Sequence, residues 1–451
     1  MIILWTDALV FLLCFMVLAC AVYLHGKEHI RRPLQQIGQN KTGMVSLTVL
    51  LFFVGIGLLD SIHYQASGKG IQGAEASHEI ISLLDIWATP LREHGEKTYS
   101  APFALTLYSK EMMATADGAV SWGYPRLVFG GRHVDDPKQH TADAVQKTIT
   151  GLAQGLGWSG LIALLFWGGL KLGGKNLPAH GAAQAVSLTV LALFCTAYAL
   201  CYVSQYYHVL GTDKVGEDVL YQAIKSIRTG LIIGTLTTLI MLPLAIIFGI
   251  LAGFFRGWID DLIQYAYTTL NSIPSVLLIA ASILMVQVYM ANHEEAFTSI
   301  VVRADMRLLF LCMILGVTSW TGLCRLLRAE TLKLREMEYV QAAYALGVKP
   351  ATILIRHILP NVMHIVLISV VLDFSSLVLA EAVLSYINIG VDPTTYSWGN
   401  MINGARLEMA REPMVWWSLS AAFIFMLALV LAANLLADTV QQAFDPRRIN
   451  G

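Results

Sequence analysis

The sequence predicts an all-α integral membrane protein, a polytopic helical bundle of about nine spans. Of its 451 residues, 56% are hydrophobic and only 14% are charged, whereas soluble domains average about 45–50% apolar and about 25% charged. The mean hydropathy is +0.61. A soluble protein cannot hide that much apolar surface, so soluble enzymes, disordered chains and fibrous proteins are excluded. The net charge of −1 gives no sign of a nucleic-acid partner.

The expected spans follow from runs of about 20 mostly apolar residues, the length that crosses a bilayer as a helix. The run at 154–170 is short and rich in glycine, so it is the weakest of them. The nine runs lie at roughly 2–24, 43–60, 154–170, 182–204, 229–254, 272–290, 307–323, 363–385 and 416–438.

The first run, 2–24, has an alternative interpretation as a cleaved signal peptide, since Val17-Leu18-Ala19-Cys20 resembles a lipoprotein cleavage box. Residues 1–9 contain no lysine or arginine, whereas a secretory signal begins with positive charge. Basic residues follow the run instead. We therefore expect a retained membrane helix.

A polar stretch of about 90 residues, 61–150, separates the second and third runs. It contains several prolines and the turn dipeptides Asp117-Gly118 and Gly130-Gly131, which mark loops between folded elements. We expect a small folded domain outside the bilayer. The runs at 154–170 and 182–204 then make a segment of two further spans, 151–206.

Lysine and arginine in the short loops set the expected orientation, because they accumulate on the cytoplasmic side. If the loop 25–42 is cytoplasmic, the inner loops hold fifteen such residues and the outer loops seven. The N-terminus and the 61–150 domain are then outside and the C-terminus is cytoplasmic. Nine spans satisfy that arrangement, since their number is odd.

The loop from Arg325 to Asn361 is the most informative segment. Its amphipathic pattern contains the small pair Ala342-Ala343 and then Gly347, which tolerates a helix end with positive φ. Pro350 suits the first turn of a second helix, and Pro360 is expected to stop the segment before the next span. The pattern predicts a helix–turn–helix offered to a soluble partner. An ordinary interfacial amphipathic helix is the alternative.

The spacing Gln341-Ala-Ala-x3-Gly347-x11-Leu359-Pro360 resembles the EAA loop of ABC importer permeases, whose signature is EAA-x3-G-x9-I-x-L-P. Gln341 replaces the glutamate, and His357 stands at the isoleucine position. The run Arg356-His-Ile-Leu-Pro-Asn361 is similar to the variant found in the C-type subunit of the dipeptide, oligopeptide and nickel permease family.

Further resemblances to that subunit run in order over residues 208–451. They are His208-Val-Leu-Gly-Thr-Asp213, Gly216-Glu-Asp-Val-Leu220, Ala252-Gly-Phe-Phe-Arg-Gly-Trp-Ile-Asp260, Glu381-Ala-Val-Leu-Ser-Tyr386, Ser397-Trp-Gly399 and Asp445-Pro-Arg447. The front half departs from the family pattern of six spans. The expected organisation is an extra helix and basic loop (1–42), the usual first span (43–60), the inserted domain (61–150), two additional spans (151–206) and the permease core (207–451), with the EAA loop at 325–361.

The resemblance implies a permease subunit of the bacterial inner membrane that is not itself an enzyme. It implies a heterodimer with a second homologous permease subunit, two ATP-binding subunits that use ATP and Mg²⁺, and a periplasmic or lipid-anchored substrate-binding protein. No cofactor is implied in this chain. The EAA loop then docks into a cleft of one ATPase and passes its motion to the spans. The coupling residues implied are Gln341, Ala342, Ala343, Gly347, Lys349, Arg356, Leu359 and Pro360.

Two carboxylates, Asp373 and Glu381, lie in the run 363–385. A charge at mid-bilayer costs about 2.5–3.5 kcal/mol on insertion scales, so each is expected to face protein or water. They are candidates for the translocation path, with Asp373 nearest the middle. A helix–helix hydrogen bond is the alternative.

Other functions remain open at the level of sequence. The HxxEH pattern of His25, Glu28 and His29 corresponds to an inverted zinc-protease motif and gives the alternative of a membrane-embedded metalloenzyme. A permease-like sensor without ATPases is a third possibility. Within the transporter class, nickel chelates, heme-like ligands and antimicrobial peptides are alternatives to dipeptides and oligopeptides.

Overall fold

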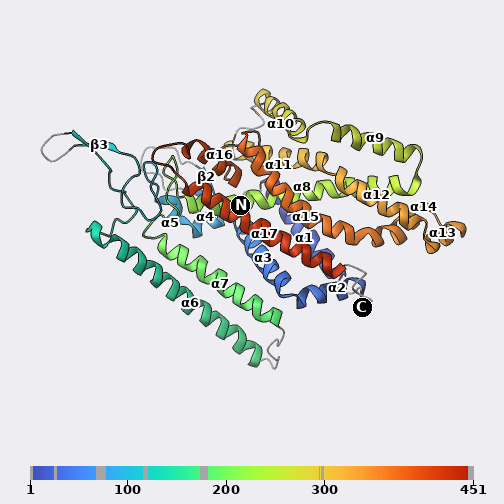
Figure 1. Ribbon diagram of the computed structural model, residues 1–451, viewed down its shortest axis with the longest axis horizontal. Coiled ribbons are helices and arrows are strands. Elements are labelled where there is room, and N and C mark those ends of the chain that lie inside the picture. The colour runs from blue at the N-terminus through green and yellow to red at the C-terminus, as the bar shows by residue number, and fades with distance from the viewer. Residues whose placement is uncertain are drawn as a thin grey trace. The chain divides into compact units, whose positions relative to one another are not determined.

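The computed structural model describes residues 4–24, 28–67, 78–114, 120–172, 181–293, 295 and 299–444. These residues are overwhelmingly helical (Figure 1), and the strands among them form two two-stranded ribbons. The prediction of an all-α polytopic membrane protein is confirmed.

The helices and strands follow one another in a simple order. The first part of the chain contains α1 (Trp5–Leu24), α2 (Glu28–Gln39), α3 (Lys41–Asp60), β1 (His63–Ser67), β2 (His78–Ser82), α4 (Leu83–Trp87), α5 (Thr89–Glu93), β3 (Glu111–Ala114), β4 (Val120–Gly123), the 3-10 turn η1 (Pro137–Gln139), α6 (His140–Leu172) and α7 (Gly181–Val203). The rest contains α8 (Val219–Phe255), α9 (Trp258–Ser272), α10 (Ser275–Asn292), α11 (Ile300–Ser319), α12 (Thr321–Arg335), α13 (Glu338–Ala345), α14 (Pro350–Ile353), the π-helical turn η3 (Leu354–Ile358), α15 (Leu359–Tyr386), α16 (Trp398–Glu408) and α17 (Trp417–Phe444).

The chain divides into two compact units. The first comprises residues 1–3, 38–229 and 396–432. In it, α7 packs against α6 along one side and against α3 on another, and the long α6–α7 hairpin is visible in Figure 1. Gly155 lets the two helices of the hairpin come close, because a Cβ there would lie 3.0 Å from the carbonyl oxygen of Cys195.

The polar stretch 61–150 belongs to this first unit and is folded where it is described. Strand β1 pairs antiparallel with β2, and β3 pairs antiparallel with β4 with Met112 opposite Trp122. A buried cluster joins the stretch to the α7–α8 connection through side chains of both. It includes Ala88, Leu91, Val134, Val203, Tyr207, Val209, Leu220 and Tyr221.

The second unit comprises residues 4–37, 230–395 and 433–451. Its helices pack in the pairs α1 with α11, α10 with α11 and α12 with α15. The Thr6 side chain on α1 donates a hydrogen bond to Asp305 on α11, and the Thr6 backbone N–H lies 3.3 Å from the same carboxylate. Helix α1 is thus packed within the second unit, and its retention stays a prediction.

In the described part of the chain, six helices are long and apolar enough to cross a bilayer. They are Lys41–Asp60, Gly181–Val203, Val219–Phe255, Ser275–Asn292, Pro350–Tyr386 and Trp417–Phe444. The remaining three predicted runs overlap helices α1, α6 and α11. Helix α6 begins fourteen residues before the predicted 154, and α11 begins seven residues before the predicted 307. The number of spans stays a prediction.

Candidate functional site

The connection between α12 and α15 has the predicted helix–turn–helix form. Helix α13 ends at Ala345, the chain turns at Gly347, and α14 begins at Pro350. Gly347 has a φ of +75°, in the left-handed region that glycine adopts without strain. A Cβ at Gly347 would meet no atom within 4 Å, so the turn needs glycine for its backbone conformation rather than for space.

The inner face of this connection packs into the second unit. Val340 and Ala343 of α13 are buried with Ile353 and Ile358, and all four belong to one hydrophobic cluster. The two alanines of the motif therefore lie in different surroundings. Ala343 is buried in the hydrophobic cluster of the second unit, whereas Ala342 is exposed. The burial fixes α13 and α14 to the helices below them.

The outer face presents two apolar side chains, which two cations follow along the chain. Leu346 is 83% exposed and Tyr344 is 69% exposed. Lys349, which precedes α14, and Arg356, in η3, are also exposed. Exposed apolar side chains bordered by polar groups are typical of a surface that binds another protein. We name Tyr344, Leu346, Lys349 and Arg356, with the Gly347 turn, the α13–α14 surface.

The prediction that Pro360 stops the segment is wrong. Helical structure continues from Pro350 to Tyr386, and Pro360 lies in the first turn of α15. A proline removes the backbone N–H that would bond to the carbonyl four residues earlier. Here η3 changes the hydrogen-bond pattern just before it, because the Leu359 N–H bonds to Leu354 O, five residues back. The proline is therefore accommodated within a continuous helix.

Helix α12, which leads into the connection, is held against α9 by a bidentate ion pair. Arg328 Nε lies 2.6 Å from Asp260 Oδ1, and its terminal nitrogen lies 2.7 Å from Asp260 Oδ2. The Arg328 hydrogen bonds, which outweigh the effect of burial, lower the pKa of Asp260. A Cβ at Gly253 would lie 2.8 Å from Arg328 O, so the end of α8 packs closely on α12 as well.

A second tie joins α13 to the turn after α8 through Glu336. Arg256 donates to Glu336 Oε1 at 2.6 Å, and the Gln341 side-chain amide lies 3.3 Å from Glu336 Oε2. Gln341, the residue that departs from the family glutamate, is thus a donor to a neighbouring carboxylate. The sequence motif did not reveal Glu336 or Asp260 as supporting residues, because their arginine partners are 80 and 68 positions away along the chain.

The two intramembrane carboxylates of α15 differ in their surroundings. Glu381 is 2% exposed and accepts a hydrogen bond of 2.7 Å from Ser385 one turn later. Asp373 is only partly buried, and the described residues supply it with no hydrogen bond or ion pair. The structure brings neither of them into contact with the α13–α14 surface.

The described residues give the metalloenzyme alternative no support. His25 lies outside the described residues, and Glu28 and His29 are described only as backbone of α2. Within the described ranges, no group of three or more His, Cys, Asp or Glu side chains is placed to hold a metal ion.

The fold defines a polytopic membrane protein whose α12–α15 connection exposes apolar and basic side chains. Residues 245–450 match the family described as "binding-protein-dependent transport system inner membrane component". The oligopeptide transport system permease protein OppC of Mycobacterium tuberculosis is 30% identical over 281 residues, which are 59% of this chain and 90% of that protein. The chain belongs to this family of ABC importer permeases, in its peptide-transport group.

Other relatives have the same character. The dipeptide transport system permease protein DppC of Lactococcus lactis is 29% identical over 240 residues, 53% of this chain and 64% of that protein. The glutathione transport system permease protein GsiD of Pectobacterium atrosepticum is 30% identical over 240 residues, 53% of this chain and 73% of that protein. These relatives are permease subunits, and this chain is accordingly a transport subunit rather than an enzyme.

Proposed function

We propose that this chain is a permease subunit that carries dipeptides or oligopeptides inward and couples their passage to ATP hydrolysis in partner subunits. The choice of peptides is supported by the relatives, which are named for oligopeptide, dipeptide and glutathione transport. The single observation that carries the coupling is the α13–α14 surface, where Leu346 and Tyr344 are exposed on helices whose other face is buried.

The α13–α14 surface is suited to transmit force to the membrane helix α15. Val340, Ala343 and Ile353 anchor it to the hydrophobic cluster below, so force applied to Leu346 moves the whole connection. From Pro350 the helical structure runs without interruption through α15 to Tyr386. A conformational change in an ATPase bound to α13 is thereby transmitted along a continuous helix into the membrane.

The proposed topology follows from the charge distribution of the loops. The α13–α14 surface and the C-terminus are cytoplasmic, and the N-terminus and residues 61–150 are outside, in a bacterial inner membrane. The partners are two ATP-binding subunits with ATP and Mg²⁺, a second homologous permease subunit and an outside substrate-binding protein. The domain boundaries proposed are 1–42, 43–60, 61–150, 151–206 and 207–451.

Asp373 is the better of the two candidates for the translocation path. A carboxylate in a membrane helix faces protein, water or a partner, and Glu381 is already enclosed and hydrogen-bonded by Ser385. Asp373 has no such partner among the described residues. We assign Asp373 to the path or its wall and Glu381 to the packing of α15.

Docking is tested by placing a charge on the α13–α14 surface. The chain is co-expressed with its second permease subunit and its ATP-binding subunits, and their co-purification is measured. ATP-dependent peptide uptake is then measured in proteoliposomes that also contain the substrate-binding protein. Leu346→Asp is expected to lose co-purification and to reduce uptake at least tenfold, because a charge replaces the most exposed apolar side chain of the surface. Val215→Asp is the matched control, since Val215 is also a largely exposed apolar residue but lies in a loop proposed to be outside.

Gly347→Ala separates docking from transmission. An alanine adds no charge to the surface but is strained at the positive φ of the turn. We expect ATP hydrolysis to continue while uptake per ATP falls. Equal uptake by Leu346→Asp and wild type would refute the coupling role. Competition of uptake by peptides, glutathione and nickel chelates then identifies the substrate class.

A further inference from the structure

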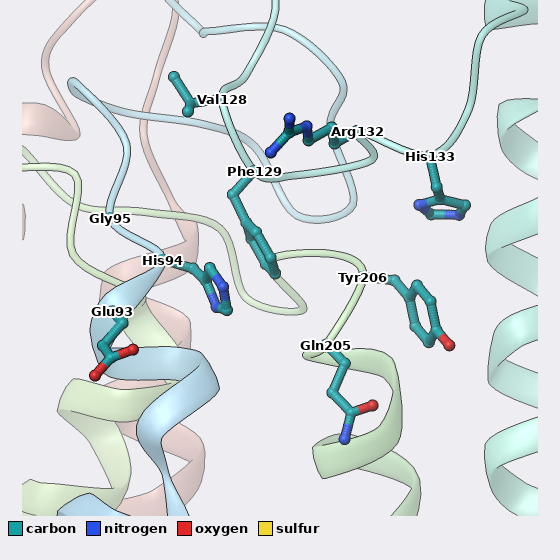
Figure 2. Close-up of a pocket in the computed structure, with 9 residues that line it drawn as sticks. All are labelled: Glu93, His94, Gly95, Val128, Phe129, Arg132, His133, Gln205 and Tyr206. Atoms are coloured by element: carbon teal, nitrogen blue, oxygen red, sulfur yellow. The ribbon is translucent and has the colours of Figure 1, made fainter.

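A pocket of about 570 Å³ opens in the first unit, between the stretch 61–150 and the end of α7 (Figure 2). That volume falls in the range of about 300–1,000 Å³ typical of small-molecule sites. The pocket lies outside residues 245–450, which match the family. Its lining residues are Glu93, His94, Gly95, Val128, Phe129, Arg132, His133, Gln205 and Tyr206.

One wall of the pocket is fixed from behind by a buried carboxylate. Glu96 accepts hydrogen bonds of 2.8 Å from the backbone N–H groups of Val128 and Phe129, and one of 3.1 Å from Gly130. The His94 ring stacks on Phe129 with their centroids 3.6 Å apart. The aromatic pair is therefore a preformed platform, on a loop that Glu96 holds by three hydrogen bonds.

The opposite wall is also held in place. His133 Nε2 lies 2.6 Å from Asp143 Oδ2, and the His133 ring meets the edge of Tyr206 at 5.2 Å. Lys147 Nζ lies 3.9 Å from the centre of the Tyr206 ring. His133 and Asp143 thus satisfy each other, so neither offers a free charge to a ligand.

Two charges of the pocket do remain available. Among the described residues, no acidic group pairs with the Arg132 guanidinium and no basic group pairs with the Glu93 carboxylate. Figure 2 shows Arg132 above the Phe129 ring and Glu93 beyond His94 on the other side of that ring. The Gln205 side chain contributes an amide at the α7 end. A free cation and a free carboxylate flank an aromatic platform.

We propose that this pocket binds a short zwitterionic peptide, with its carboxylate at Arg132, its amino group at Glu93 and an apolar side chain on the His94–Phe129 platform. A guanidinium recognises a carboxylate with two parallel hydrogen bonds, and the amide of Gln205 is available to the peptide bond. The choice of a peptide among zwitterions rests on the proposed function. The pocket is a site additional to the path through the membrane.

The test measures binding of the dipeptide Ala-Phe to the purified full-length chain in lipid nanodiscs, without other subunits, by isothermal titration calorimetry. N-acetyl-Ala-Phe lacks the amino charge and Ala-Phe-amide lacks the carboxylate, and each is expected to bind at least tenfold more weakly. Arg132→Gln and Glu93→Gln should weaken Ala-Phe at least tenfold. Lys138→Gln is the matched control, because Lys138 is exposed in the same stretch but does not line the pocket.

The two charge variants also predict opposite selectivities. Arg132→Gln should no longer distinguish Ala-Phe from Ala-Phe-amide, and Glu93→Gln should no longer distinguish Ala-Phe from N-acetyl-Ala-Phe. Absence of Ala-Phe binding at millimolar concentration to the wild-type chain would overturn the proposal, and so would equal affinity in the wild type and both variants. Uptake by the assembled complex is measured separately. Uptake without pocket binding refutes the pocket alone, whereas binding without peptide uptake refutes the proposed function alone.

Discussion

His208 Nδ1 lies 2.7 Å from Asp218 Oδ2, in the connection that leads from α7 into α8. The other oxygen of Asp218 accepts hydrogen bonds from the backbone N–H groups of Leu220 and Tyr221, at 2.8 and 3.2 Å. Asp218 therefore caps the first turn of α8 and pairs with His208 at once. On the far side of the imidazole, Glu96 Oε1 lies 3.6 Å from His208 Nε2. The start of α8 is thus linked to the residue that holds one wall of the pocket.

This arrangement predicts a loss of stability in alkaline solution. Burial by itself lowers the pKa of His208, but the hydrogen bond to Asp218 and the nearby negative charges of Asp218 and Glu96 outweigh it and raise that pKa to about 9. A group with a raised pKa in the folded state stabilises fully below its ordinary pKa of about 6.5 and loses that contribution as the pH rises through about 9. The midpoint of thermal unfolding of the solubilised chain is expected to fall between pH 7 and pH 10.

His208→Gln provides the comparison for that experiment. A neutral amide keeps a hydrogen bond to Asp218 but leaves two buried carboxylates without a cation, so the variant should unfold at a lower temperature at pH 7. Its midpoint should also change less than that of the wild type from pH 7 to pH 10. If both proteins follow the same pH curve, His208 is not the titrating group.

Lys225 is predicted to be essential for the stability of the first unit. Its Nζ lies 2.8 Å from Asp85 Oδ1 and 3.3 Å from Asp60 Oδ1, and the Lys225 side chain is only 13% exposed. Burial raises the pKa of Asp85, but the charge of Lys225 and further hydrogen bonds outweigh it and lower that pKa. Lys225→Met leaves two partly desolvated carboxylates together and should cost about 3–5 kcal/mol of unfolding free energy.

The measurement is thermal or denaturant unfolding of the purified chain, with Lys214→Met as a control because Lys214 is exposed in the α7–α8 connection. Lys225→Met combined with Asp85→Asn should recover part of the loss, since one buried charge is then removed. A Lys225→Met protein as stable as the control would show that solvent reaches the cluster and screens it.

The sequence predicted those parts of the structure that depend on local pattern. Apolar runs predicted the helices, and the glycine and proline spacing at 347 and 350 predicted the turn between α13 and α14, because backbone preferences act over a few residues. It failed at Pro360, since the π-helical turn that accommodates this proline depends on hydrogen bonds spread over the preceding residues. The sequence also did not predict the fold of residues 61–150, because that fold depends on backbone pairing between short strands and between loops that are distant along the chain.

The supporting residues of the candidate sites could not be predicted from the sequence either, because their partners are distant along the chain. Glu96 meets the N–H groups of Val128 and Phe129 more than thirty positions later, and Lys225 meets Asp85 140 positions earlier. No spacing rule reports such a pairing. The burial that distinguishes Asp373 from Glu381, eight residues apart on one helix, is likewise set by the helices around them.

Asp373 and Glu381 are predicted to respond differently to the loss of charge. Asp373→Asn should leave the unfolding midpoint nearly unchanged, because no described residue pairs with Asp373, and should lower uptake of peptides several-fold. Glu381→Leu removes the acceptor of the Ser385 hydroxyl and should lower stability by about 1–3 kcal/mol. Both variants are assayed for unfolding and for uptake in proteoliposomes. Unchanged uptake and assembly in Asp373→Asn would remove Asp373 from the path.

The Arg256–Glu336–Gln341 tie is predicted to act on transmission rather than on stability. Arg256 and Glu336 are about half exposed, and exposed ion pairs contribute only about 0.2–1 kcal/mol. Gln341→Glu places a second carboxylate beside Glu336. The hydrogen bond between α13 and Glu336 is then replaced by electrostatic repulsion between two carboxylates. We expect a change in unfolding free energy below about 1 kcal/mol, but a clear fall in peptide transported per ATP hydrolysed by the reconstituted complex. Gln341→Glu combined with Glu336→Gln restores an amide–carboxylate pair and should restore the ratio. If the double variant is as uncoupled as Gln341→Glu alone, the position of α13 does not depend on this tie.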